Sequence, residues 1–294
     1  MRFFSLFLLV IFSLSLCSYQ PTKKLKVMSY NIWNGFDWGK DSVRQQRLIN
    51  WIEKKNPDVV ALQELCGYTE EKLKADAAKW GHPYSILLKT SGYPVGLTSN
   101  SPIELREKVL DNLWHGMLHV QTHGIDFYVV HLSPSKVNFR MKEAELISEK
   151  IKSSMNKKYI ILGDFNAHSP FDNNQLEKNS SLLSKYHANK SIQQNKNLRE
   201  GKFDYAVISK FIALPSMDVC QQYIPASKRY TFPTPVLIGR NNNTLESIRN
   251  NKERIDYMFV SPVLNSACTN AFIFNTNVPD TLSDHYPIMA TFEF

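Results

Sequence analysis

The sequence contains few cysteines, and none in a metal-binding pattern. Only four occur among its 294 residues, and no two are spaced as Cys-x-x-Cys. Cys17 lies near the start, and Cys66, Cys220 and Cys268 remain, an odd number. Such a set predicts neither a thiolate zinc site nor a full disulfide framework. A single bridge between Cys220 and Cys268 stays open.

The chain also lacks a linker, an internal repeat and a second long apolar run. Its longest apolar stretch, Phe3 to Leu16, follows Arg2 and is too short for a comfortable membrane span. We therefore interpret residues 1–18 as a secretory signal peptide and expect an exported protein. The protein would be secreted or periplasmic, or anchored to a membrane as a lipoprotein through Cys17. Residues 25–294 are expected to form one large domain.

Acidic residues are in the minority. The 35 Lys and Arg residues exceed the 27 Asp and Glu residues, which gives a formal net charge of +8. This balance favours polyanionic partners, with nucleic acid as the first candidate and an anionic membrane surface as another. Many exported proteins are basic without binding either, so the charge alone does not identify the partner. The sequence indicates no obligate protein partner.

Segments with strand and helix periodicity alternate along the chain, which predicts an α/β fold with two stacked sheets and helices outside. Helices are predicted at Asp41 to Lys54, Thr69 to Trp80 and Val137 to Met155. Strands are predicted at Leu25 to Asn31, Asp58 to Gln63, Tyr84 to Leu88, Gly96 to Ser99, Gly116 to Thr122, Ile125 to His131, Tyr159 to Leu162, Arg254 to Val260, Ala271 to Phe274 and Ile288 to Phe294.

Two polar segments look peripheral to this framework. Phe171 to Arg199 is rich in Asn, Gln, Ser and Lys and has few apolar anchors. Gly239 to Lys252 reads as a solvated loop with an Asn run. The second segment leads into a predicted strand and brings Arg249 near it. The segment is therefore either a surface loop or a part of the protein that contributes to substrate specificity.

Polar residues occupy the positions where apolar strands end, which is where sheet-based sites collect their chemistry. Each of them alone has an ordinary structural explanation, such as capping a turn, pairing with a lysine or filling a half-buried position. The set comprises Asn31, Glu64, His131, Asp164 with Asn166, Asp256, and His285 beside Asp284.

In this order, the residues resemble the endonuclease/exonuclease/phosphatase superfamily, the group that contains deoxyribonuclease I, abasic-site endonucleases, neutral sphingomyelinases and inositol polyphosphate phosphatases. The resemblance spans Lys26 to Phe294 and implies a four-layer α/β sandwich, two packed mixed sheets flanked by helices, with the site at one end. Its matching pieces are Met28-Ser29-Tyr30-Asn31-Ile32-Trp33, Leu62-Gln63-Glu64, Val130-His131-Leu132, Gly163-Asp164-Phe165-Asn166, Arg254-Ile255-Asp256-Tyr257 and Ser283-Asp284-His285-Tyr286-Pro287.

The resemblance implies metal-assisted hydrolysis of a phosphate ester. Asn31, Glu64 and Asp284 would supply hard oxygen ligands, which suit Mg²⁺ or Mn²⁺. Asp164 would orient or deprotonate the attacking water. Asn166 would hold a phosphate oxygen, because its amide both donates and accepts.

The resemblance also implies two histidines at the reacting phosphate. His285 would be a principal catalytic residue, paired with Asp284 or with another nearby carboxylate. His131 would donate to the scissile phosphate. Asp256 would bind metal or orient an imidazole.

One departure from the family pattern affects substrate choice. Many relatives carry an Arg-Gly or Gly-Arg pair before the first histidine, whereas this chain has Trp114-His115-Gly116. His115 could replace the arginine as a phosphate contact, or it could face solvent, which we favour for a lone polar side chain. The leading hypothesis is a secreted Mg²⁺-dependent phosphodiesterase acting on nucleic acid. Alternatives are a sphingomyelinase-like enzyme, a phosphatase of inositol or other small phosphorylated compounds, and a non-catalytic binding module.

Overall fold

The computed structural model describes residues 23–154, 156–188 and 197–294. The predicted signal peptide and Cys17 therefore lie outside the described residues. None of the helices within these ranges combines the length and the apolar character that crossing a membrane requires.

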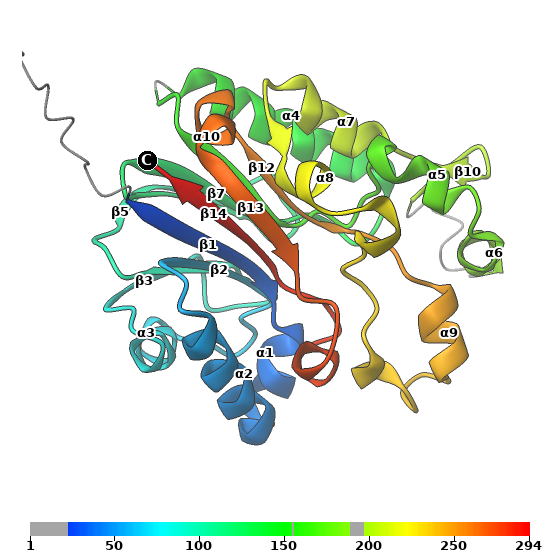
Figure 1. Cartoon of the computed structure of the whole chain (residues 1–294), viewed down its shortest axis with the longest axis horizontal. Helices are drawn as coiled ribbons and strands as arrows, with labels where there is room; N and C mark the ends of the chain where they lie inside the picture. Colours follow the sequence, from blue (N-terminus) through cyan, green and yellow to red (C-terminus); the bar gives the residue numbers. More distant parts are fainter. Residues whose placement is uncertain (1–22, 155, 189–196) are drawn as a thin grey trace, which may run out of the picture.

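Two six-stranded mixed sheets stack against each other (Figure 1). The first has the order β13-β14-β1-β2-β4-β3 and the second β11-β12-β8-β7-β6-β5. The strands of the first sheet are β1 (Lys24–Asn31), β2 (Val59–Gln63), β3 (Tyr84–Leu87), β4 (Gly96–Ser99), β13 (Cys268–Ile273) and β14 (Ile288–Glu293). Those of the second are β5 (Glu104–Val109), β6 (Met117–Thr122), β7 (Ile125–His131), β8 (Tyr159–Asp164), β11 (Met217–Asp218) and β12 (Asp256–Val260).

Helices cover the outer face of each sheet, with α1, α2 and α3 on one side of the stack and α4 and α7 on the other (Figure 1). The α-helices are α1 (Trp33–Gly39), α2 (Ser42–Lys55), α3 (Glu70–Lys79), α4 (Val137–Ser153), α5 (Asn173–Leu176), α6 (Ser180–Ala188), α7 (Ala206–Ala213), α8 (Val219–Tyr223), α9 (Leu245–Asn250) and α10 (Pro262–Ala267). A two-stranded ribbon, β9 (Leu198–Arg199) with β10 (Lys202–Phe203), lies beside α5 and α6 (Figure 1). The predicted four-layer α/β sandwich is confirmed.

Local sequence signals account for the ends of the outer helices. The carboxylate of Asp41 accepts the backbone N–H of Arg44 at 3.0 Å and caps α2. Asn56 ends that helix in the left-handed conformation, with φ of 49°. The Thr69 hydroxyl caps α3 in the same way as Asp41, by accepting the N–H of Lys72.

Three apolar clusters hold the layers together. One lies between the sheets and includes Val27, Phe127 and Phe292. A second packs the outer face of the second sheet against α4 and α7, and a third packs the first sheet against α2 and α3. Because β2, β7, β8 and β12 are buried on both faces, their sequences are nearly continuous apolar runs. That property made them recognisable from the sequence.

Two parallel strand pairs bring the functional ends of four strands to one edge of the stack. β1 pairs with β2 in parallel, so that Asn31 lies opposite Gln63. β7 pairs with β8 in parallel, so that His131 lies opposite Asp164. Both pairs end in polar residues, and the site forms where they end.

The structure adds elements that the sequence did not predict. The charged edge strand β5 was not predicted, because its exposed Glu, Arg and Lys side chains hide the strand periodicity. The segment Gly239 to Lys252 is not only loop but also contains α9, whose capping box joins Thr244 and Ser247. The segment Phe171 to Arg199 contains α5 and α6.

The disulfide that the sequence left open is not formed. Cys66, Cys220 and Cys268 are free thiols in the described part of the chain, and all three are buried. Cys220 and Cys268 both belong to the cluster between the sheets. There they act as small apolar side chains, which is a common role of buried cysteine.

Candidate active site

His131, Asp164 and Asp256 form a row across three neighbouring strands. Asp164 lies opposite His131 of β7 on one side and opposite Asp256 of β12 on the other. Side chains in register on adjacent strands project to the same face of a sheet. β12 runs antiparallel to β8, so its first residue meets the last residue of β8. The row therefore gathers two carboxylates and an imidazole at one edge of the second sheet.

His285 joins this row from the loop before β14. Its Nδ1 lies 2.9 Å from Oδ2 of Asp256, and its Nε2 lies 3.8 Å from Oδ2 of Asp164. The sequence left its partner open between Asp284 and another carboxylate, and the structure selects Asp256. Burial lowers the pKa of His285, but the charges of Asp256 and Asp284 outweigh burial and hold this pKa well above its ordinary value. The imidazole is therefore protonated at neutral pH.

Asp164 is the most enclosed carboxylate of the row. Burial and the neighbouring charge of Asp256 raise its pKa to about 8. Its Oδ1 accepts the backbone N–H of Asn166 at 2.8 Å, and its Oδ2 accepts Nδ2 of Asn31 at 3.1 Å. A carboxyl group with this pKa is mostly protonated at pH 7, and the form that ionises just above neutral pH can act as a general base.

The first sheet supplies Asn31 and Glu64. Nδ2 of Asn31 donates to Oε1 of Glu64 at 3.2 Å as well as to Asp164, so one amide links the two sheets. Oδ1 of Asn31 accepts the N–H of Trp33 at 3.1 Å. Oε2 of Glu64 accepts the N–H of Asn34 at 2.7 Å. Asn31 therefore fixes the position of Glu64, and its predicted role as a metal ligand stays a prediction.

Glu64 and Asp284 fit a divalent cation. Both line the same pocket. Burial raises the pKa of Asp284 to about 7, and the charge of Glu64 adds to this rise while His285 opposes it. Two carboxylates that disfavour each other's charge are stabilised by a shared cation, and Mg²⁺ prefers such hard oxygen donors.

A second group also has the composition of a metal site. One ligand atom each from Asp164, Asp256 and His285 lies within 4.8 Å of the others. In this group, however, Nδ1 of His285 is already paired with Asp256. The described residues thus contain an acidic and histidine cluster that could hold a metal ion, with Glu64 and Asp284 beside it.

His115 does not face solvent, and that expectation was wrong. Its side chain is buried, and its ring stacks on His131 with centroids 4.1 Å apart and planes at 22°. Burial and the charge of Lys89 lower the pKa of His115 to about 4. Burial, followed by the charges of His115 and His285, lowers the pKa of His131 well below its ordinary value. Both stacked rings are therefore neutral at neutral pH, so they pack without charge repulsion.

A left-handed turn holds Glu64 in place. Residues Asn34 to Trp38 within α1 have φ between 50° and 63°, a conformation that costs roughly 1–2 kcal/mol for each residue other than glycine. Buried Arg44 anchors the chain before this turn, since its NH1 donates to the carbonyl groups of Ile32 and Leu282 at 2.8 and 2.9 Å, and its guanidinium lies 4.8 Å from the ring of Phe36 within the turn. Strain of this kind persists where the surroundings fix it, and such places are often functional.

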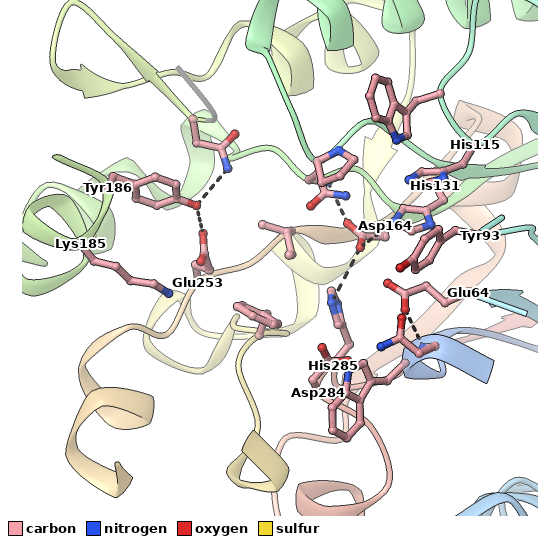
Figure 2. A pocket seen from close by; sticks show the side chains of 18 residues that line it. Glu64, Tyr93, His115, His131, Asp164, Lys185, Tyr186, Glu253, Asp284 and His285 are labelled. Carbon is pink, nitrogen blue, oxygen red and sulfur yellow. Dashed lines mark hydrogen bonds and ion pairs between the residues drawn. The ribbon is translucent and has the colours of Figure 1, made fainter. Parts of the chain in front are cut away.

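One pocket of about 520 Å³ contains the site (Figure 2). Aromatic side chains of Trp33, Tyr93, Trp114 and Phe232 line it together with the polar residues described above. Sequence reasoning missed one polar part of the lining: Lys185, Tyr186, Asn197 and Glu253. Lys185, Tyr186 and Asn197 lie in the segment Phe171 to Arg199, which looked peripheral. Only Glu253 could have been placed near the site from the sequence, because it precedes Asp256 by three residues.

Comparison with known proteins agrees with this geometry. The sequence profile of the Endonuclease/Exonuclease/phosphatase family matches residues 28–285. The chain belongs to the endonuclease/exonuclease/phosphatase family. The family predicted from six short motifs is thereby confirmed. The predicted enzyme class, a hydrolase that acts on phosphate ester bonds, is confirmed as well. A search of curated proteins finds no match.

Solved structures of the same fold show how far this likeness reaches. An AP endonuclease from Archaeoglobus fulgidus is 19% identical, with a TM-score of 0.69 over 91% of this chain and 99% of that one. A 3′ phosphatase from Neisseria, NExo, bound to a product DNA hairpin, is 18% identical, with a TM-score of 0.66 over 92% and 100%. A humanized D. rerio TDP2 is 19% identical, with a TM-score of 0.58 over 92% and 98%. At these identities the likeness establishes the fold alone.

Within this family site, the structure brings most of the predicted residues together. Glu64, His115, His131, Asp164, Asn166, Asp284 and His285 line the pocket, while Asn31 and Asp256 support it through hydrogen bonds. Arg249 is the exception, because it is exposed on α9 and is not among the pocket-lining residues. From the same segment, Arg240 instead lies 4.8 Å above the ring of Trp33.

Proposed function

We propose that the protein is a Mg²⁺-dependent phosphodiesterase that hydrolyses nucleic acid by attack of water on phosphorus. The observation that carries this proposal is the convergence of a carboxylate with a raised pKa, Asp164, and a protonated imidazole, His285, in one pocket. Hydrolysis of an ester requires a base that accepts a proton and an acid that donates one. Here the surroundings of the two groups shift their pKa values in the way that these roles need.

In this mechanism, ionised Asp164 accepts a proton from the water that attacks phosphorus, the P–O bond to the leaving group breaks, and His285 donates a proton or hydrogen bond to the oxygen that leaves. Asp256 keeps the imidazolium in position, since it binds the opposite ring nitrogen. Neutral His131 and Asn166 donate to the phosphate oxygens. A Mg²⁺ ion held by Glu64 and Asp284 would neutralise charge on the phosphate when bound.

Nucleic acid is proposed first because the chain carries a formal charge of +8, and phosphodiester backbones attract cationic proteins. Mn²⁺ is the alternative metal, because it accepts the same oxygen ligands. An anionic membrane surface remains the alternative polyanionic partner. We also propose export, on the strength of the apolar stretch Phe3 to Leu16, with secretion or anchoring through Cys17 as the two outcomes.

The test is conversion of supercoiled plasmid by the mature protein with Mg²⁺, with and without chelator, beside the His285→Ala variant. Chelator-sensitive nicking that disappears in the variant would support nuclease activity at this site. Nicking that persists in the variant would point to a contaminating nuclease or to another site.

Hydrolysis of a small phosphorylated compound is the second candidate. It is favoured by the pocket, whose volume of about 520 Å³ is in the range of small-molecule sites. An intact plasmid together with chelator-sensitive release of phosphate from a sugar or inositol phosphate would favour this candidate. A sphingomyelinase-like activity would instead appear with sphingomyelin vesicles.

A further inference from the structure

The pocket has a second polar end that the proposed mechanism does not use. Figure 2 shows Lys185, Tyr186 and Glu253 gathered on one side of the pocket, away from the group of Glu64, Asp164 and His285. Lys185 and Tyr186 come from α6, and Glu253 directly precedes the segment that leads into β12. These side chains line the same pocket as the catalytic residues.

Glu253 is a buried residue whose carboxylate uses only one of its two oxygens for hydrogen bonds within the described part of the chain. The residue is 5% exposed, and its Oε2 lies 2.7 Å from Nε2 of His168 and accepts the hydroxyl of Tyr186 at 2.8 Å. Oε1 has no hydrogen-bond partner among the residues that the structure describes. An ionised carboxylate accepts several hydrogen bonds, and Oε1 is not one of the fully enclosed unpartnered atoms of the described residues, so it stays accessible to a ligand. Oε1 is thus suited to accept from a bound molecule.

The charge state of Glu253 agrees with this role. Burial raises its pKa, but the hydrogen bond and charge of His168, with further help from Lys185 and Tyr186, bring the pKa below the ordinary value. Glu253 is therefore ionised at neutral pH.

A hydrogen-bonded chain fixes Glu253 in the wall of the pocket. The hydroxyl of Tyr186 accepts Nδ2 of Asn197 at 3.1 Å, and Oδ1 of Asn197 accepts NH2 of Arg140 at 2.8 Å. The backbone of Glu253 pairs with that of Phe232 in an isolated β-bridge. A carboxylate supported in this way is positioned before any ligand arrives, which reduces the entropy cost of binding.

The combination of groups indicates the chemistry of the ligand. Lys185 is a cation and Glu253 is an anion, so their charges balance at this end of the pocket. The net charge therefore favours neither an ammonium group nor a carboxylate group on the ligand. Phe232 adds an apolar ring, 5.9 Å from the ammonium group of Lys185. Donors and acceptors beside an apolar surface match a ring that carries several hydroxyl groups, since each hydroxyl both donates and accepts.

We propose that Lys185, Tyr186 and Glu253 form a subsite for a hydroxyl-bearing ring attached to the scissile phosphate. This inference rests on the proposed phosphoesterase chemistry and favours esters of a ribose or of a cyclitol over DNA, because the sugar within a DNA chain carries no free hydroxyl group. A ring without hydroxyl groups would leave Oε1 of Glu253 unmatched. Sites that hydrogen-bond a hydroxyl reject analogues that lack it, by roughly tenfold or more for each unmatched group.

The experiment compares binding of two matched pairs by calorimetry with the full mature protein. The first pair is adenosine 5′-monophosphate and its 2′,3′-dideoxy analogue, and the second is inositol monophosphate and cyclohexyl phosphate. We expect the hydroxylated member of at least one pair to bind about tenfold more tightly, and the pair that discriminates identifies the ring. Equal affinities within both pairs would overturn the proposal.

Variants then assign the discrimination to these side chains. Lys185→Ala and Glu253→Gln should each reduce the affinity ratio towards one, and Lys185 is exposed, so its replacement leaves folding intact. Lys178→Ala, at another exposed lysine of the same segment, is the matched control and should keep the wild-type ratio. An unchanged ratio in Lys185→Ala and Glu253→Gln would remove both residues from the subsite.

The binding readout separates the two proposals. If no phosphate ester is hydrolysed but the affinity ratio is present and lost in the variants, the proposed function fails while the subsite stands. If bis(p-nitrophenyl) phosphate is hydrolysed with chelator sensitivity but both pairs bind equally, the proposed function stands while the subsite fails.

Discussion

Asp256 and His285 are 29 residues apart in the sequence, yet Oδ2 of the first lies 2.9 Å from Nδ1 of the second. Asp256 begins β12, and His285 comes from the loop before β14 of the other sheet. Their pair therefore joins the two sheets at the edge where the site lies. It also leaves Nε2 of His285 directed towards Asp164, at 3.8 Å.

Asp256→Asn should lower kcat by about 10²- to 10⁴-fold, because the amide cannot hold the charged imidazolium as a carboxylate does. The measurement is steady-state hydrolysis of bis(p-nitrophenyl) phosphate, with circular dichroism to establish that the variant is folded. Asp111→Asn, at an exposed aspartate, is the matched control. A folded Asp256→Asn protein with wild-type kcat would show that this pair is structural.

Removal of the metal should abolish turnover, and Glu64→Gln should raise the Mg²⁺ concentration needed for half-maximal activity by about 10- to 100-fold. The reason is the loss of one anionic ligand, while the amide oxygen still accepts the N–H of Asn34. A Mg²⁺ titration of activity measures the shift. Glu149→Gln, exposed on α4, serves as control, and an identical titration in Glu64→Gln would exclude Glu64 from the metal site.

The stacked His115 should make the folded protein sensitive to acid. Its pKa is about 4 in the folded state against an ordinary value of 6.5. Between these values the unfolded chain binds a proton that the folded protein does not, so stability falls as the pH decreases from about 6.5 to about 4. The linked loss is up to roughly 3 kcal/mol.

His115→Phe keeps an aromatic ring against His131 and removes this titration. Urea unfolding at pH 7 and pH 5 should therefore show a smaller loss of stability on acidification in the variant than in the wild-type protein. If acidification destabilises both proteins equally, His115 is not the origin of the acid sensitivity.

Gly35→Ala should destabilise the protein by about 3 kcal/mol or more. Gly35 has φ of 54°, and a Cβ atom there would overlap the carbonyl oxygen of Cys66. The displaced turn would also withdraw the N–H of Asn34 from Glu64, so activity should fall with stability. Gly124→Ala is the control: its φ is 72° but nothing lies within 4 Å of the added atom, and it should cost only about 1 kcal/mol.

Arg249→Ala tests whether a polyanion extends beyond the pocket. If α9 binds nucleic acid, the variant should bind more weakly, with a slope of log affinity against log salt reduced by about one. Lys54→Ala, exposed near the end of α2, should leave the slope unchanged. The same slope in Arg249→Ala and wild type would make Arg249 an ordinary surface residue.

The sequence alone determined the layers and most of the site. Buried strands such as β2, β7 and β8 are short apolar runs, and the polar residues that end them are readable without any structure. Their order along the chain resembles the endonuclease/exonuclease/phosphatase pattern, and this resemblance placed Glu64, His131 and Asp164 in one site. The strands depend on local periodicity and the motifs on short local sequences, and a sequence displays both directly.

Only the tertiary structure decided which side chains face each other. Asp256 rather than Asp284 holds His285, because register across antiparallel strands and the path of a loop are set by packing between distant segments. The burial of His115 and the placing of Lys185 beside Glu253 have the same origin. Such contacts join residues far apart in the chain, and no local pattern encodes them.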